Sequence, residues 1–147
     1  MKKLLTLGNC LRCCALALGL VAFCFMFGDQ VGAKGGLTGT FYTISFSDAF
    51  FTFNGTLGFV GYILIGIAAL CTCFLTFNGL FNFVKLDKNV KLVCVALTSL
   101  LFLLGGIFVL CLAAVIGEFS LTAFSIIAGI LAIVSAILVC LSFFVER

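Results

Sequence analysis

The sequence predicts an all-α membrane protein: a four-helix transmembrane bundle in which a long first outer loop has partial strand character. Four long apolar stretches alternate with polar connections, and the third, residues 91–116, has no charge after Lys91 and no proline. At a rise of about 1.5 Å per residue, this stretch is long enough to cross the ~30 Å hydrocarbon layer of a bilayer. We therefore expect one integral membrane domain over residues 1–147.

The composition agrees with this fold class. The chain is 65% hydrophobic and 9% charged, whereas soluble domains have about 45–50% apolar and about 25% charged residues. The net charge is +3, but seven of the eight basic residues lie where membrane topology requires them. The net charge therefore gives no reason to expect a nucleic-acid partner. We expect the chain to be embedded in the lipid bilayer.

The first predicted span covers residues 4–27 and follows the basic residues Lys2 and Lys3. A cleaved signal peptide is the alternative, because residues 31–33 offer small side chains at plausible cleavage positions. We favour a retained helix. In that helix Arg12 is within reach of the inner interface, and we expect its side chain to extend to that interface.

The connection over residues 28–56 begins with polar and flexible residues and then alternates in polarity, as a half-buried strand does. A short apolar helix is predicted over residues 49–53. We expect this loop to lie at the outer interface. The two faces of the alternating stretch are Tyr42, Ile44 and Phe46 on one side, and Thr43 and Ser45 on the other.

The second predicted span covers residues 57–83, and small or hydroxylated side chains recur along it every three or four positions. Such a face indicates packing against another helix, since apolar burial discriminates little between helices inside lipid. The functional alternative is a polar pathway through a pore. Its candidate lining residues are Thr72, Thr76, Asn78 and Asn82.

The connection over residues 85–91 gives the topology. It carries Lys85, Lys88 and Lys91 with one aspartate, and short basic loops stay in the cytoplasm. Alternation then places both termini inside and the long connection outside. We expect an integral protein of the plasma membrane, with cytoplasmic N and C termini.

The third span and the fourth, over residues 121–145, carry small side chains at regular spacing, which predicts close helix packing. Gly117 suits a helix C-terminus and Ser120 a helix N-cap, so spans three and four are expected to be antiparallel neighbours. In the fourth span the ridge runs from Ser125 to Ala136. The predicted helix-packing residues are Gly106, Ala113, Gly117, Gly129 and Ala132.

No catalytic, cofactor or metal site is predicted. The chain has nine cysteines but no histidine, and its CxxC at Cys10 and Cys13 has no second pair, so we interpret these thiols as packing residues. Spans two, three and four contain no ionisable residue at membrane depth, and HExxH, GxSxG and phosphate-loop motifs are absent from the sequence. We therefore expect that the protein is not an enzyme.

The leading functional hypothesis is a non-enzymatic interaction protein. The small-residue faces and the aromatic outer loop favour an accessory or self-associating tetraspan, whose partner is another membrane protein or a second copy. The alternative is an oligomeric channel or small-solute transporter lined by the polar face of the second span. The layout resembles the tetraspan architecture of claudins and their relatives in topology only, because the outer loop lacks their Trp and Cys-Cys signature.

Overall fold

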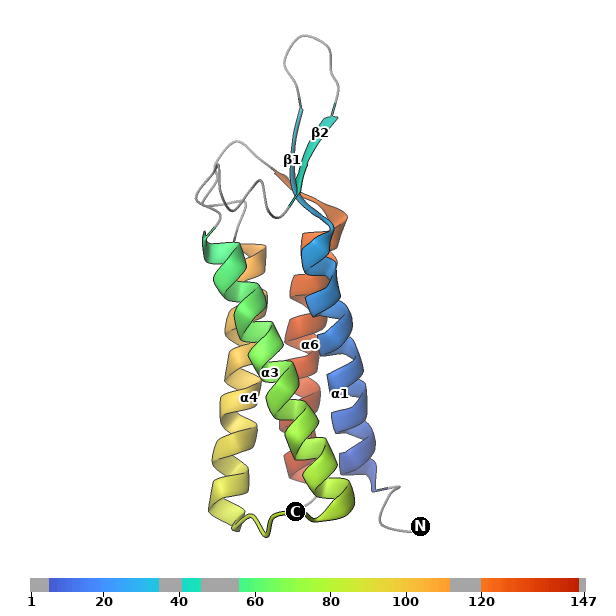
Figure 1. The fold of residues 1–147 in the computed structure, drawn as a ribbon, viewed down its shortest axis with the longest axis vertical. Coiled ribbons are helices and arrows are strands. Elements are labelled where there is room, and N and C mark those ends of the chain that lie inside the picture. The colour runs from blue at the N-terminus through green and yellow to red at the C-terminus, as the bar shows by residue number, and fades with distance from the viewer. Residues whose placement is uncertain (1–5, 35–40, 46–55, 112–119, 146–147) are drawn as a thin grey trace.

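The computed structural model describes residues 6–34, 41–45, 56–111 and 120–145. Its elements follow one another in Figure 1 from blue to red. They are α1 (Leu7–Cys24), the 3-10 turn η1 (Phe25–Phe27), β1 (Asp29–Lys34), β2 (Phe41–Ser45), α3 (Thr56–Phe81), α4 (Lys88–Leu110), β3 (Ser120–Leu121) and α6 (Ala123–Val145).

Four of the described helices are long and apolar enough to cross a membrane, in agreement with the four apolar stretches of the sequence. The chain is therefore a small membrane protein. By length and composition, the spanning segments within the described residues are Leu7–Phe27, Phe59–Phe81, Lys88–Leu110 and Ala123–Val145.

The helices form a bundle in which α1 packs against α3 and α6, and α4 packs against the same two helices. The start of α1, the connection from α3 to α4 and the end of α6 lie at one end of the bundle (Figure 1). Strands β1 and β2 project from the opposite end. We call the first of these ends the lysine end, after the lysines of the α3–α4 connection.

Capping residues set the bounds of the α3–α4 connection. Helix α3 stops at Phe81 because Asn82 has a positive φ of 52° and its N–H donates to the carbonyl of Asn78 at 2.9 Å, a left-handed C-terminal cap. Helix α4 starts at Lys88, whose N–H donates to the Asp87 carboxylate at 2.8 Å. The connection covers residues 82–87 and not the predicted 85–91, because α3 ends at Phe81 and because Lys88 and Lys91 belong to the first turn of α4.

The three strands form an antiparallel sheet in the order β2-β1-β3. Val31 pairs with Ile44 on one side and with Leu121 on the other. The prediction that Ser120 caps the fourth helix is therefore wrong: it lies in β3, and α6 begins at Ala123. The predicted helix over residues 49–53 and the turn at Gly117 lie outside the described residues.

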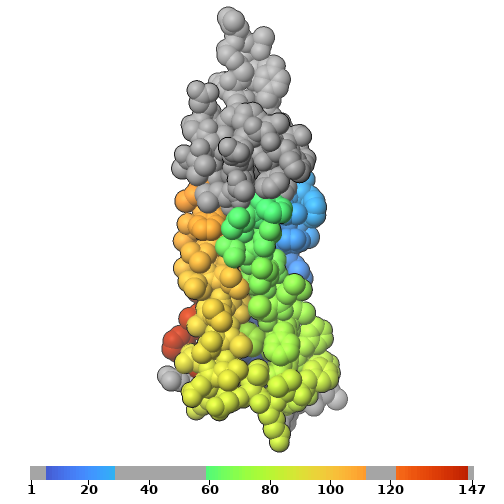
Figure 2. All heavy atoms as spheres, turned by 60° about the vertical axis from the view of Figure 1, so that its left-hand side comes forward, coloured from blue at the N-terminus to red at the C-terminus, as the bar shows by residue number. Residues whose placement is uncertain are grey.

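Small side chains fill much of the bundle interior, and two large rings, those of Tyr62 and Phe102, are fully buried among them. Phe102 of α4 is fully buried, and a Cβ added to Gly19 of α1 would lie 2.7 Å from its ring. Ala69 of α3 borders the same site. The outward faces carry the large aliphatic and aromatic side chains, and Figure 2 shows two of these faces, on α3 and α4, side by side. This distribution suits a bundle surrounded by lipid.

Candidate functional site

The predicted small-residue ridge of the fourth span packs inside the chain. A Cβ on Gly106 of α4 would lie 2.8 Å from the carbonyl oxygen of Gly129 and 3.3 Å from the Cβ of Ala132, both on α6. Three of the five predicted packing residues thus meet at one α4–α6 contact. The other two, Ala113 and Gly117, lie outside the described residues. Because this contact is internal, the ridge is not a free surface for a partner.

A second close contact joins α3 and α4. The sequence indicated the small-residue face of α3 but not the residue of α4 that packs against it. A Cβ on Gly61 would lie 2.9 Å from the carbonyl oxygen of Gly105, and a Cβ on Gly105 would lie 2.8 Å from that of Gly61. The two backbones approach each other directly, as small residues allow. The neighbouring glycines Gly105 and Gly106 were the sequence feature that could have indicated this contact. Gly105 packs against α3, and Gly106 packs against α6.

The two threonines proposed as pore-lining residues are buried within the bundle. The Thr72 hydroxyl donates to the Ala68 carbonyl at 2.8 Å, and the Thr76 hydroxyl donates to the Thr72 carbonyl at 2.7 Å. Both hydroxyls are therefore satisfied within α3, in the back-bonding pattern common for threonine in helices.

The two asparagines proposed for the same lining shape the chain reversal after α3. The side-chain oxygen of Asn78 accepts a hydrogen bond from the N–H of Val84 at 2.9 Å. Asn82 supplies the left-handed residue that ends the helix. The four candidate pore residues thus fall into two groups, with the threonines in the core and the asparagines at the lysine end.

The positive φ of Asn82 gives a testable prediction. We expect Asn82→Leu to lower the free energy of unfolding by about 1 kcal/mol, because branched and bulky residues adopt left-handed conformations at a cost, while Asn82→Gly leaves stability unchanged or slightly higher. Unfolding by SDS titration in mixed micelles measures both. An equal loss in the two variants would show that the side-chain amide, and not the backbone conformation, is what matters here.

Arg12 lies in a different environment from the one predicted. Its side chain does not extend freely to the interface; it is 1% exposed and packs between α1 and α3. Its Nη1 donates to the side-chain oxygen of Asn9 at 3.4 Å. Gly79 of α3 makes room for both groups, since a Cβ there would lie 2.7 Å from that Asn9 oxygen and 3.0 Å from the Arg12 nitrogen.

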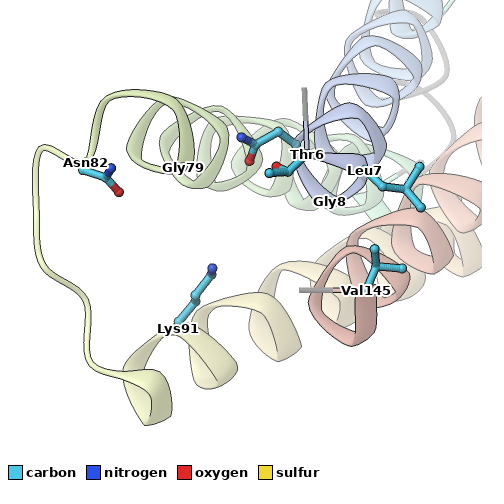
Figure 3. A pocket seen from close by; sticks show the side chains of 8 residues that line it. Thr6, Leu7, Gly8, Gly79, Asn82, Lys91 and Val145 are labelled. Carbon is cyan, nitrogen blue, oxygen red and sulfur yellow. The ribbon is translucent and has the colours of Figure 1, made fainter. Parts of the chain in front are cut away.

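Two adjoining cavities open at the lysine end, with volumes of about 590 and 440 Å³. Gly79, Asn82 and Lys91 line both of them. Figure 3 shows the Lys91 side chain extending from α4 into the space of the larger cavity, across from Asn82 and the start of α1. The smaller cavity is also lined by Arg12, Asn78 and Lys85. We refer to the two together as the basic cleft.

The cysteines are free thiols in the structure, and all nine lie within the described residues. Cys10, Cys13 and Cys14 are exposed on α1. Within the described part of the chain, histidine, cysteine and acidic side chains form no group of three or more that could hold a metal ion.

Comparison with known proteins gives no relative of this chain. No protein-family model matches it, and neither a curated protein nor a solved structure is similar to it at a significant level. The packing and charge of this chain are therefore the basis for proposing its function.

Proposed function

We propose that the chain is a non-enzymatic protein of the plasma membrane that acts by associating with another membrane protein or with a second copy of itself. In this proposal both termini and the α3–α4 connection are cytoplasmic, and the long connection with its strands is outside. The positive-inside rule supports this orientation, because Lys85, Lys88 and Lys91 gather at the end of the bundle where α1 starts and α6 ends (Figure 1).

The observation that carries the proposal is an aromatic row on the outward face of α3. Phe74, Phe77 and Phe81 follow one another at helical spacing and are 51%, 50% and 59% exposed. The rings of Phe77 and Phe81 are stacked, with centroids 6.1 Å apart. Large, rigid aromatic side chains are enriched at protein interfaces, and this row is on the surface, whereas the small-residue ridges are occupied by contacts within the chain.

Replacing this aromatic row tests the proposal. We expect Phe74→Ala/Phe77→Ala/Phe81→Ala to abolish association between two differently labelled copies in liposomes, measured by energy transfer between the labels, or to release a partner that copurifies with the wild type. A matched triple variant on the outward face of α6, Ile130→Ala/Ile137→Ala/Phe144→Ala, should leave association intact, since it removes side chains of similar exposure.

Two results would count against the proposal. One is a wild-type protein that is monomeric at high protein-to-lipid ratio and copurifies with no stoichiometric partner. The other is an equal effect of the α3 and α6 triple variants, which would indicate a general response to lost apolar volume and not a specific contact surface.

The alternative, an oligomeric channel or small-solute transporter, has weaker support. Its proposed lining requires the hydroxyls of Thr72 and Thr76 to face a path, but both are buried and donate to carbonyls of their own helix. A flux through liposomes that changes with Thr76→Val would restore this alternative. Thr76→Val is a cleaner test than Asn82→Leu, because Asn82 also determines the backbone at the end of α3.

A further inference from the structure

The basic cleft has an excess of positive charge at the level where the spans end. Its lining residues that the structure describes include Arg12, Lys85 and Lys91, and no aspartate or glutamate. Asp87 is close in the sequence, but its carboxylate accepts the N–H of Lys88 at the start of α4 and does not line either cavity. The cleft therefore favours an anionic group.

Arg12 makes the cleft a preorganised site and not only a cationic surface. Ionisable residues within membrane spans are costly and usually mark functional positions, and this guanidinium is almost completely buried. It donates a hydrogen bond to Asn9, and Gly79 leaves the space that it occupies. A guanidinium is planar and presents several N–H donors, a geometry that matches the oxygens of a phosphate group.

An apolar groove on the outside of α3 and α4 lies next to the cleft. Leu75 lines both the smaller cavity of the cleft and this groove, which has a volume of about 320 Å³. Cys94, one helical turn beyond Lys91, and Leu97 form its α4 side. The groove therefore leads from the lysine end toward the middle of the bundle, parallel to the expected direction of lipid chains.

We propose that the basic cleft binds the phosphate headgroup of an anionic phospholipid, with one acyl chain in the α3–α4 groove. Charge complementarity selects an anionic over a zwitterionic headgroup, and the apolar groove beside the cleft, which shares the lining residue Leu75 with it, favours a lipid over a soluble phosphate. The binding site lies at the ends of α3 and α4, where phospholipid headgroups meet the spans.

Lipid titration of the purified full-length protein in mild detergent tests this assignment, with bound lipid counted by native mass spectrometry. The probes are dioleoylphosphatidylglycerol, dioleoylphosphatidylcholine, sn-glycerol 3-phosphate and inorganic phosphate. We expect saturable binding of the first, at least tenfold weaker binding of the second, and no binding of the two soluble phosphates at comparable concentrations.

Lys91→Gln and Lys88→Gln form a matched pair for the same titration. Both lysines lie in the first turn of α4, but only Lys91 lines the cleft. We expect Lys91→Gln to weaken phosphatidylglycerol binding about tenfold, the typical effect of losing one hydrogen bond to a charged group, and Lys88→Gln to leave it within twofold. Arg12→Gln should weaken binding further, but this variant also loses a buried contact with Asn9. Lys91→Gln is therefore the variant that tests whether the cleft is the binding site.

Each contrary result has a definite meaning. Equal binding of the two lipids would overturn the role of charge, and equal effects of the two lysine variants would overturn the cleft as the site. Binding of inorganic phosphate as tight as that of the lipid would overturn the lipid assignment in favour of a soluble phosphate ligand. Phe74 of the aromatic row also lines the groove, but the two lysine variants leave that row unchanged, so failure of this proposal can be distinguished from failure of the proposed association.

Discussion

Replacing Phe102 with alanine should cause one of the two largest losses of stability in this chain. The ring is fully buried at the centre of the bundle, where it touches Gly19 of α1. In soluble proteins a buried Phe→Ala substitution costs about 3–5 kcal/mol. Part of that cost is exposure to water, which separated helices in lipid do not experience, so we expect a loss of about 2–3 kcal/mol from the cavity and the lost packing.

Phe144→Ala is the matched control for this variant. The same side chain is removed from the outward face of α6, where it is 60% exposed, and the free energy of unfolding in SDS titration should change by less than about 0.5 kcal/mol. Similar losses in both variants would contradict the central position of Phe102. A second check is rescue: the double variant Gly19→Leu/Phe102→Ala should be more stable than Phe102→Ala alone, because the new side chain enters the vacated space.

The spans themselves were predictable because a bilayer excludes charge so strongly. Lys88 and the end of α6 at Val145 lie within a few residues of the predicted limits. The exact ends were less predictable, since they depend on local caps. The left-handed backbone of Asn82 ends α3. Ser120 and Leu121 pair with β1 as strand β3 and are not part of the fourth helix. Neither feature can be predicted from hydrophobicity.

The pairing of helices was predictable only in part. A small-residue face indicates that a neighbour packs there, but periodicity does not say which neighbour. Gly106 was predicted to lie on such a face, but no pattern in the sequence assigns Gly105 to a contact with α3 and Gly106 to a contact with α6. That assignment needs the three-dimensional order of the helices.

The sequence contained a pattern that indicates the burial of Arg12. The prediction instead relied on the short distance from Arg12 to the N-terminus, which suggested that the side chain reaches the interface. Arg12 shares a helical face with Ala15, Gly19 and Ala22, which are buried. A charge on the small-residue face of a helix points toward the neighbouring helices and not toward lipid. The missing information was the position of Gly79, which lies on a distant part of the chain and leaves space for the guanidinium.

Gly106→Leu should destabilise the bundle even though it improves the local helix. Glycine is less favourable than alanine in a helix interior by about 0.8–1 kcal/mol, and leucine ranks close to alanine, so an open site would gain stability. At this position the added Cβ would lie 2.8 Å from the carbonyl oxygen of Gly129 and 3.0 Å from a side-chain carbon of Ile133. Because a backbone atom cannot move aside as a flexible side chain can, α4 and α6 must separate, and we expect a net loss of about 3 kcal/mol.

The sign of this effect distinguishes internal packing from an open surface. Ala96→Leu on the same helix is the control: Ala96 is exposed, so the added side chain enters lipid and stability should stay within about 0.5 kcal/mol. SDS titration gives the free energies, and crosslinking between α4 and α6 reports whether the helices have moved apart. A Gly106→Leu protein at least as stable as the wild type would show that the ridge faces lipid or a partner, and would return the small residues of α6 to the list of candidate association surfaces.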